Sequence, residues 1–166
     1  IEPSQSATQI AIKKGFKVKN GYFQNEKIPE NSYDLVIISQ TLEHMDDPLF
    51  TLNKVRKILK KGGFVLIGVP NFGSFSAKIL RKNWYYIIPT EHKWHFSPKS
   101  LKKLVIKAGF QPIEYRTASG IFDYEYPLQE IWSSFIGLKK RFLSEFFTVI
   151  PSYILTIINQ GTSLVL

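Results

Sequence analysis

Apolar residues recur at helical spacing in three segments, each with a polar residue at its start that can cap a helix. The first helix is expected over residues 4–15, where Ser4 can accept a hydrogen bond from the first turn and a glycine closes the last. The second is expected over residues 47–63, from Asp47 and the following proline to the sequence KKGG. The third is expected over residues 97–109.

Between and after these helices lie segments with the pattern of strands. Residues 16–23 (FKVKNGYF) alternate between polar and apolar, and residues 110–117 (FQPIEYRT) read as a further strand. Residues 33–39 (YDLVIIS) and 63–70 (GFVLIGVP) are short continuous apolar runs, which are typical of strands buried on both faces. Helices and strands that alternate in this order predict an α/β protein, with a parallel sheet covered by helices on both faces.

The composition changes after residue 117. Residues 118–160 are rich in aromatic side chains and predict two helices broken at Gly137 or Pro151, while residues 161–166 resemble the start of one more strand. The aromatic side chains are expected either to pack against each other or to line an apolar substrate pocket. We therefore divide the chain into a core of residues 1–117, a helical insertion of 118–160 and a last strand beginning in 161–166.

The charge and the absence of cysteine narrow the possible functions. The 166 residues hold 22 Lys and Arg against 13 Asp and Glu, a net charge of +9, which favours either a solubilising lysine coat or an anionic partner. The basic residues form no stripe, so we do not expect a nucleic-acid partner. Without cysteine, disulfides and zinc–thiolate sites are excluded. No apolar run is long enough to span a bilayer.

Polar residues follow the buried strand of residues 33–39, beginning with Ser39 and Gln40 and continuing as TLEH. In open α/β sheets, ligands bind outside the carboxyl ends of the strands. A binding site is therefore expected at this end of the sheet.

Four segments in this order resemble class I S-adenosylmethionine-dependent methyltransferases, in the branch of quinone-biosynthesis and cell-envelope sugar methyltransferases. The segments are IEPS, KIPENSYDLVIISQTLEHMDDP, LNKVRKILKKGGFVLIGVPN and EHKWHFSPKSLKKLVIKAGF. The resemblance implies a Rossmann-like methyltransferase sheet whose first strand and glycine-rich loop are absent from this chain, with a helical insertion before the last strand. Residues 1–166 would then be an excerpt of a longer protein and inactive by themselves.

The resemblance also implies a set of residues that bind S-adenosyl-L-methionine. Glu2, beside Pro3, falls where the family has a carboxylate that accepts hydrogen bonds from both ribose hydroxyls. Ser39 and Gln40 would border the methionine end. Tyr22 and Phe23 fall where the family commonly has an acidic residue facing the adenine, so this readout departs from the family pattern.

The histidines are the candidate catalytic groups. His44 could approach the reacting atoms or order its turn by bonding to a carbonyl, and His92 could act as a general base toward a hydroxyl. His95 lies between two aromatic residues and is expected to be a packed loop histidine. No metal site is expected, because His92 and His95 lack a third ligand nearby in the sequence.

The expected function is methyl transfer to a small or lipid-linked acceptor, with oxygen as the methylated atom. The alternative is a methyltransferase-like domain that has lost catalysis and serves as a binding scaffold, which Tyr22 favours. Lys139, Lys140 and Arg141 beside apolar residues predict contact of the 118–160 segment with a membrane surface. The protein is therefore expected in the cytoplasm, at the periphery of a membrane.

Overall fold

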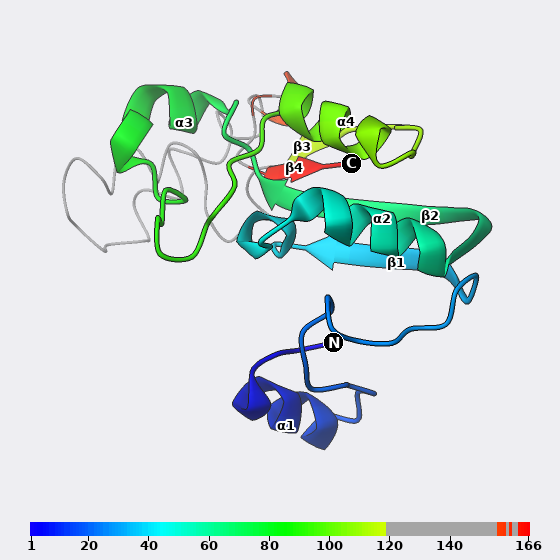
Figure 1. Cartoon of the computed structure of the whole chain (residues 1–166). Coiled ribbons are helices and arrows are strands. Elements are labelled where there is room, and N and C mark those ends of the chain that lie inside the picture. Colours follow the sequence, from blue (N-terminus) through cyan, green and yellow to red (C-terminus); the bar gives the residue numbers. More distant parts are fainter. Residues whose placement is uncertain (119–155, 159, 161–162) are drawn as a thin grey trace.

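The computed structural model describes residues 1–118, 156–158, 160 and 163–166, and the elements lie in the order expected of an α/β protein (Figure 1). The helices are α1 (Gln5–Lys13), α2 (Pro48–Ile58), α3 (Phe75–Leu80) and α4 (Pro98–Lys107), with short 3-10 turns η1 (Leu42–His44) and η2 (Arg81–Asn83). The strands are β1 (Tyr33–Ser39), β2 (Leu59–Pro70), β3 (Arg116–Ala118) and β4 (Ser163–Val165).

The strands form one sheet in the order β1-β2-β4-β3. β1 and β2 run parallel, with Val36 opposite Val65 and Ser39 opposite Gly68. β4 lies antiparallel to both of its neighbours and joins the end of the chain to β2. The α/β class and the expected last strand are therefore confirmed. Among the described residues, β1 has a sheet neighbour on one side only.

The main core lies between the sheet and the helices α2 and α4, which cover the same face (Figure 1). Leu52 and Val55 of α2 pack there with Leu101 and Val105 of α4, and none of the four is more than 1% exposed. A second, smaller cluster forms around Trp84, which follows α3 and η2. Burial of these apolar faces is what holds the helices on the sheet.

The opposite face of β1 and β2 differs from the expectation of strands buried on both faces. Leu35 and Ile37 are 51% and 61% exposed, and Phe64 and Leu66 beside them are 58% and 42% exposed. A continuous apolar run indicates what a strand can bury, whereas its actual burial depends on which elements lie against it. Within the described residues nothing covers these four side chains, so the prediction holds for one face of this part of the sheet.

The three long helices begin where the capping residues predict. Ser4, Asp47 and Ser97 each accept a hydrogen bond from the backbone of the first turn, and Ser97 forms a capping box with Ser100. Gly15 and Gly109 have positive φ angles of 85° and 83°, which glycine adopts at low cost after a helix.

Three expected boundaries were wrong. Residues 16–23 form no strand, and only Asn20 pairs there, in an isolated bridge with Glu2. The segment 110–117 is extended only at its end, in β3. α2 ends at Ile58, so the KKGG sequence lies in β2, where the register with β1 shifts. Local patterns favour an extended backbone, but a neighbouring strand must supply the hydrogen bonds that make it part of a sheet.

Replacing Asp47 by alanine should lower the free energy of unfolding by about 1 kcal/mol, because the backbone N–H of Phe50 loses its acceptor. The Asp47 carboxylate accepts this hydrogen bond at 2.9 Å. Urea unfolding followed by circular dichroism measures the change. Asp46→Ala is the matched control: it removes the neighbouring charge, which forms a surface ion pair with Lys93, and should cost less than about 0.5 kcal/mol. Equal losses in the two variants would contradict the capping role.

The division at residues 117 and 160 remains a prediction, since most of the expected insertion lies outside the described residues. The same holds for the two aromatic helices and for the basic residues Lys139 to Arg141. None of the helices in the described part of the chain has the length and apolar character needed to span a bilayer.

Candidate functional site

The carboxyl end of β1 is the first part of the candidate site. Ser39 is exposed there, and Gln40 has a positive φ angle of 47° while its N–H donates to Gly68 O at 2.8 Å. Thr41 Oγ1 donates to Ser39 O at 2.7 Å. The strand therefore ends in a hydrogen-bonded turn that leaves residues 39 and 40 exposed, at the carboxyl end of β1 where the sequence predicted polar residues.

Glu2 and Pro3 form the second part, at the start of the chain. The backbone of Glu2 bonds to Lys19 and Gly21, each at 3.0 Å, and the Asn20 side chain donates to the carbonyls of Glu2 and Pro3. Glu2 Oε1 accepts from Ser4 N at 2.8 Å, ahead of α1. The Glu2 residue is only partly buried.

Tyr22 and Phe23 follow directly on this pairing. The Tyr22 side chain is 63% exposed, whereas Phe23 packs against the main core. Lys54 of α2 holds the turn after them: its ammonium donates to the carbonyls of Phe23, Gln24 and Glu26 at 2.6, 2.9 and 2.7 Å. It also lies 5.0 Å from the centre of the Phe23 ring. This role of Lys54 had no sequence signal, since an isolated lysine on a helix is usually solvated.

A cavity of about 350 Å³ links the N-terminal segment with the sheet. Ile1 and Phe23 line it together with side chains of β1, and Thr41 and Met45 line it beyond the end of that strand. Residues next to Glu2 and Tyr22 are thus brought to the same edge of the sheet as the turn after Ser39. Of the expected cofactor residues, Phe23 lines this cavity, and Glu2, Tyr22, Ser39 and Gln40 each adjoin a lining residue in the chain.

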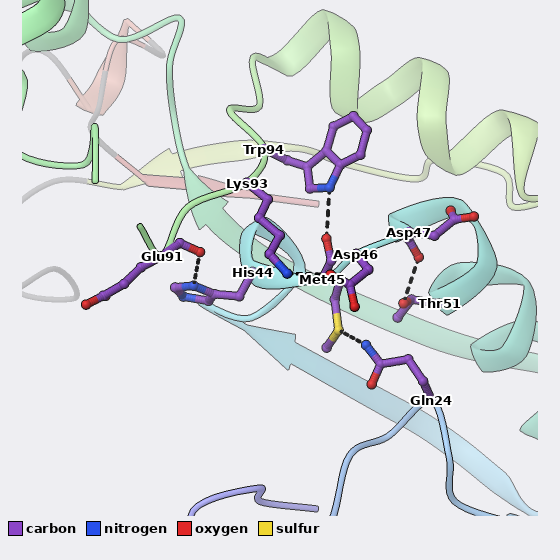
Figure 2. A network of polar contacts seen from close by, with 9 residues as sticks. All are labelled: Gln24, His44, Met45, Asp46, Asp47, Thr51, Glu91, Lys93 and Trp94. Atoms are coloured by element: carbon purple, nitrogen blue, oxygen red, sulfur yellow. Dashed lines mark hydrogen bonds and ion pairs between the residues drawn. The ribbon is translucent and has the colours of Figure 1, made fainter. Parts of the chain in front are cut away.

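The turn around η1 is fastened to the segment that follows η2 (Figure 2). The N–H groups of Lys93 and Trp94 donate to Glu43 O at 2.9 and 3.1 Å, and Trp94 Nε1 donates to Met45 O at 2.8 Å. Asp46 and Lys93 form an ion pair across the same contact. Two of the motifs noted in the sequence, LEHMDD and EHKWH, therefore form a single structural unit.

His44 and His92 meet within this unit. Their rings lie edge to face with centroids 4.7 Å apart. His44 Nδ1 is 2.9 Å from Glu91 O, so the carbonyl bond proposed as one of its two roles is present. His92 Nδ1 is 2.7 Å from Tyr86 O, and the His92 side chain is buried.

The roles expected of His92 and His95 are partly exchanged. His95 was expected to be the packed histidine, yet it is exposed and touches Phe72 edge to face, while His92 is the buried one. Partial burial and the nearby His92 lower the pKa of His95. Neighbours in the sequence do not reveal which ring turns inward, because the loop direction is set by the backbone bonds to Glu43.

Glu43 is the least expected member of the site. Its side chain is 1% exposed, and neither carboxylate oxygen has a hydrogen-bond partner among the described residues. Burial raises the pKa of Glu43, against smaller opposing effects of its own backbone N–H and of His44 and His92. Its backbone carbonyl has a structural role, because it accepts the hydrogen bonds from Lys93 and Trp94.

The sheet has an antiparallel last strand, and polar residues follow its parallel strand β1. Together with the cavity at the edge of the sheet, these features define a Rossmann-like methyltransferase fold. Residues 1–115 match the profile of the family described as "Methyltransferase domain". The chain belongs to this methyltransferase domain family, as the sequence resemblance predicted.

Solved structures support the same fold. A SAM-dependent methyltransferase from Thermotoga maritima has a TM-score of 0.66 at 24% identity, over 99% of this chain and 69% of that one. Another from Archaeoglobus fulgidus has a TM-score of 0.63 at 18% identity, over 98% of this chain and 71% of that one.

Among curated relatives, the ubiquinone biosynthesis O-methyltransferase of Cereibacter sphaeroides is 31% identical over 88 residues. The match covers 49% of this chain and 36% of that protein, so the chain corresponds to little more than a third of its relative's length.

Proposed function

We propose that the protein to which residues 1–166 belong transfers a methyl group from S-adenosyl-L-methionine to an oxygen atom of a small or lipid-linked acceptor. The observation that carries this proposal is the family match over residues 1–115. The named activity of the relative from Cereibacter sphaeroides supports oxygen as the methylated atom. The cavity beside Ile1, Phe23 and Thr41 supports the position of the cofactor.

The residues around the cavity fit a nucleoside with an amino-acid tail. Glu2 is partly buried and its carboxylate can accept hydrogen bonds from two ribose hydroxyls, and the exposed turn at Ser39 and Gln40 offers polar groups for the methionine end. The sulfonium of the cofactor supplies an already activated methyl group. The protein's part is then to align an acceptor with that carbon and to exclude water.

His44 and His92 are the proposed general bases. Each has its Nδ1 against a backbone carbonyl, which leaves Nε2 as the nitrogen that can accept a proton from an acceptor hydroxyl. His44 is exposed and could meet an acceptor directly, whereas His92 lies beneath it.

A binding scaffold without catalysis is the second candidate function, and Tyr22 favours it. Tyr22 is exposed, and by the sequence resemblance it falls where the family commonly has an acid facing the adenine. A phenol can also stack on the base, which is compatible with cofactor binding.

Titrating S-adenosylhomocysteine into the full-length protein by calorimetry tests the proposal. We expect one tight site, and affinity at least about tenfold weaker in Glu2→Ala, because hydrogen bonds to a charged group contribute about 1.5–3 kcal/mol each. Glu2→Gln keeps an acceptor for Ser4 N and separates loss of charge from loss of the local turn. Glu114→Ala removes an exposed carboxylate beside Arg116 and should bind normally.

No heat from a folded protein would reject the methyl-transfer proposal and favour the scaffold. If Glu2→Ala binds S-adenosylhomocysteine as strongly as the unchanged protein, the cofactor proposal stands but Glu2 is not part of the cofactor site.

A further inference from the structure

Three side chains of different chemical types converge beside η1. Glu43, His44 and His92 each offer one ligand atom, and these atoms all lie within 4.8 Å of one another. Glu43 and His92 are 1% and 9% exposed, while His44 is open to solvent. The group is therefore buried on two sides and accessible on the third.

Both histidines are held in the same tautomer. A backbone carbonyl can only accept a hydrogen bond, so Nδ1 of His44 must carry its proton toward Glu91 O, and Nδ1 of His92 toward Tyr86 O. In each neutral ring Nε2 then has a free lone pair. A ring nitrogen bonded to a backbone carbonyl, with the other nitrogen free, is the arrangement usual for metal-binding histidines.

The carboxylate of Glu43 is a third hydrogen-bond acceptor beside Nε2 of His44 and Nε2 of His92, and no donor lies among these three groups. Both of its oxygens are buried without a hydrogen-bond partner among the described residues, although burying an unpaired carboxylate is costly. Oε1 is 3.9 Å from His44 Nε2, too far for a hydrogen bond. Acceptor atoms face each other here, and a positive ion between them would satisfy all three.

We propose that Glu43, His44 and His92 bind one divalent ion of a first-row transition metal, such as Zn²⁺. Two imidazoles and one carboxylate suit Zn²⁺ or Fe²⁺, whereas Mg²⁺ and Ca²⁺ prefer sites made of oxygen ligands. Ligand atoms about 2 Å from the metal lie within about 4 Å of one another, so the side chains need to close only slightly. Three protein ligands leave a coordination position on the open side of His44 for water or an acceptor oxygen.

This site departs from the expectation of no metal, which rested on the spacing of His92 and His95. The spacing of His92 and His95 did not reveal this site because two of its ligands, Glu43 and His44, come from another segment. The bonds from Lys93 N and Trp94 N to Glu43 O bring that segment into place. In the metal-bound protein His44 and His92 would be ligands and not general bases, so the two roles exclude each other.

The test is a calorimetric titration of ZnCl₂ into the chelator-treated, full-length protein, with a parallel titration of MgCl₂. We expect one zinc ion per chain and no comparable heat with magnesium. Glu43→Gln and His92→Gln should weaken zinc binding at least about 100-fold, because loss of a direct ligand exceeds the effect of changing the groups that orient it. His95→Gln is the matched control and should bind zinc as the unchanged protein does.

Circular dichroism establishes that each variant is folded. Should the two buried variants unfold, His44→Gln still decides, since it replaces an exposed ligand and should also weaken binding strongly. Zinc that binds with the same affinity in His44→Gln as in His95→Gln would be an adventitious ion only and would overturn the proposal. Absence of zinc binding by the folded, unchanged protein would overturn it equally, and because no cofactor takes part, either result is independent of methyl transfer.

Discussion

Leu42→Ala should lower the free energy of unfolding by about 3 kcal/mol, the largest loss of stability that we expect from a single change. Leu42 is fully buried in the main core, although it belongs to the short turn η1 and not to a long helix or strand. Alanine would leave a cavity between this turn and the sheet, whose walls can close only partly because neighbouring side chains are already packed. Urea unfolding monitored by circular dichroism measures the loss.

The same change should disturb the site, because Leu42 directly precedes Glu43 and His44. Ile106→Ala is the control: it shortens a side chain that is 52% exposed on α4 and should change stability by less than about 0.5 kcal/mol. A loss below about 1 kcal/mol in Leu42→Ala would mean that the turn is not anchored by this side chain.

Lys54→Met should lower the free energy of unfolding by about 2 kcal/mol, because the ammonium donates hydrogen bonds to the backbone carbonyls of Phe23, Gln24 and Glu26, and these bonds would be lost. Methionine preserves most of the length of the side chain but cannot donate. The turn that contains Gln24 would lose its attachment to α2. Thermal and urea unfolding measure the stability.

The effect of Lys54→Met on ligand binding can be measured separately. If the turn after Tyr22 and Phe23 borders the cofactor, the affinity for S-adenosylhomocysteine should fall several-fold in the folded variant. Lys57→Met, at an exposed position of the same helix, should leave stability and affinity nearly unchanged. Equal behaviour of the two variants would show that the three carbonyl bonds do not fix the turn.

Much of the fold could be predicted from short stretches of sequence. The caps at Ser4, Asp47 and Ser97 were found from residue type and spacing, because a cap depends on atoms only three residues apart. β1 and the start of β4 were found from apolar runs. The open polar end of β1 at Ser39 followed from the position of that strand in a parallel sheet.

The expected binding residues were found largely by resemblance, and the structure then placed them. Neighbours of Glu2 and Tyr22 reach the cavity beside β1 because the start of the chain pairs with Asn20 and because Phe23 packs into the core. Neither the residues around Glu2 nor those around Tyr22 indicate by themselves that the two segments lie near the same cavity. The alternation of polar and apolar residues over 16–23 predicted a strand that does not form. A strand needs a neighbouring strand to supply its hydrogen bonds, and here only Asn20 pairs, with Glu2.

The sequence by itself determined the family, the α/β class and the starts of the helices α1, α2 and α4, since these depend on local spacing and on motifs in a fixed order. Only the tertiary structure decided which face of β1 is buried, which of His92 and His95 turns inward, and that Glu43 lies beside two histidines with no hydrogen-bond partner for its carboxylate in the described part of the chain. Each of these depends on contacts between segments far apart in the chain. Such contacts set the burial and the charge environment of a side chain, which residue type and spacing do not contain.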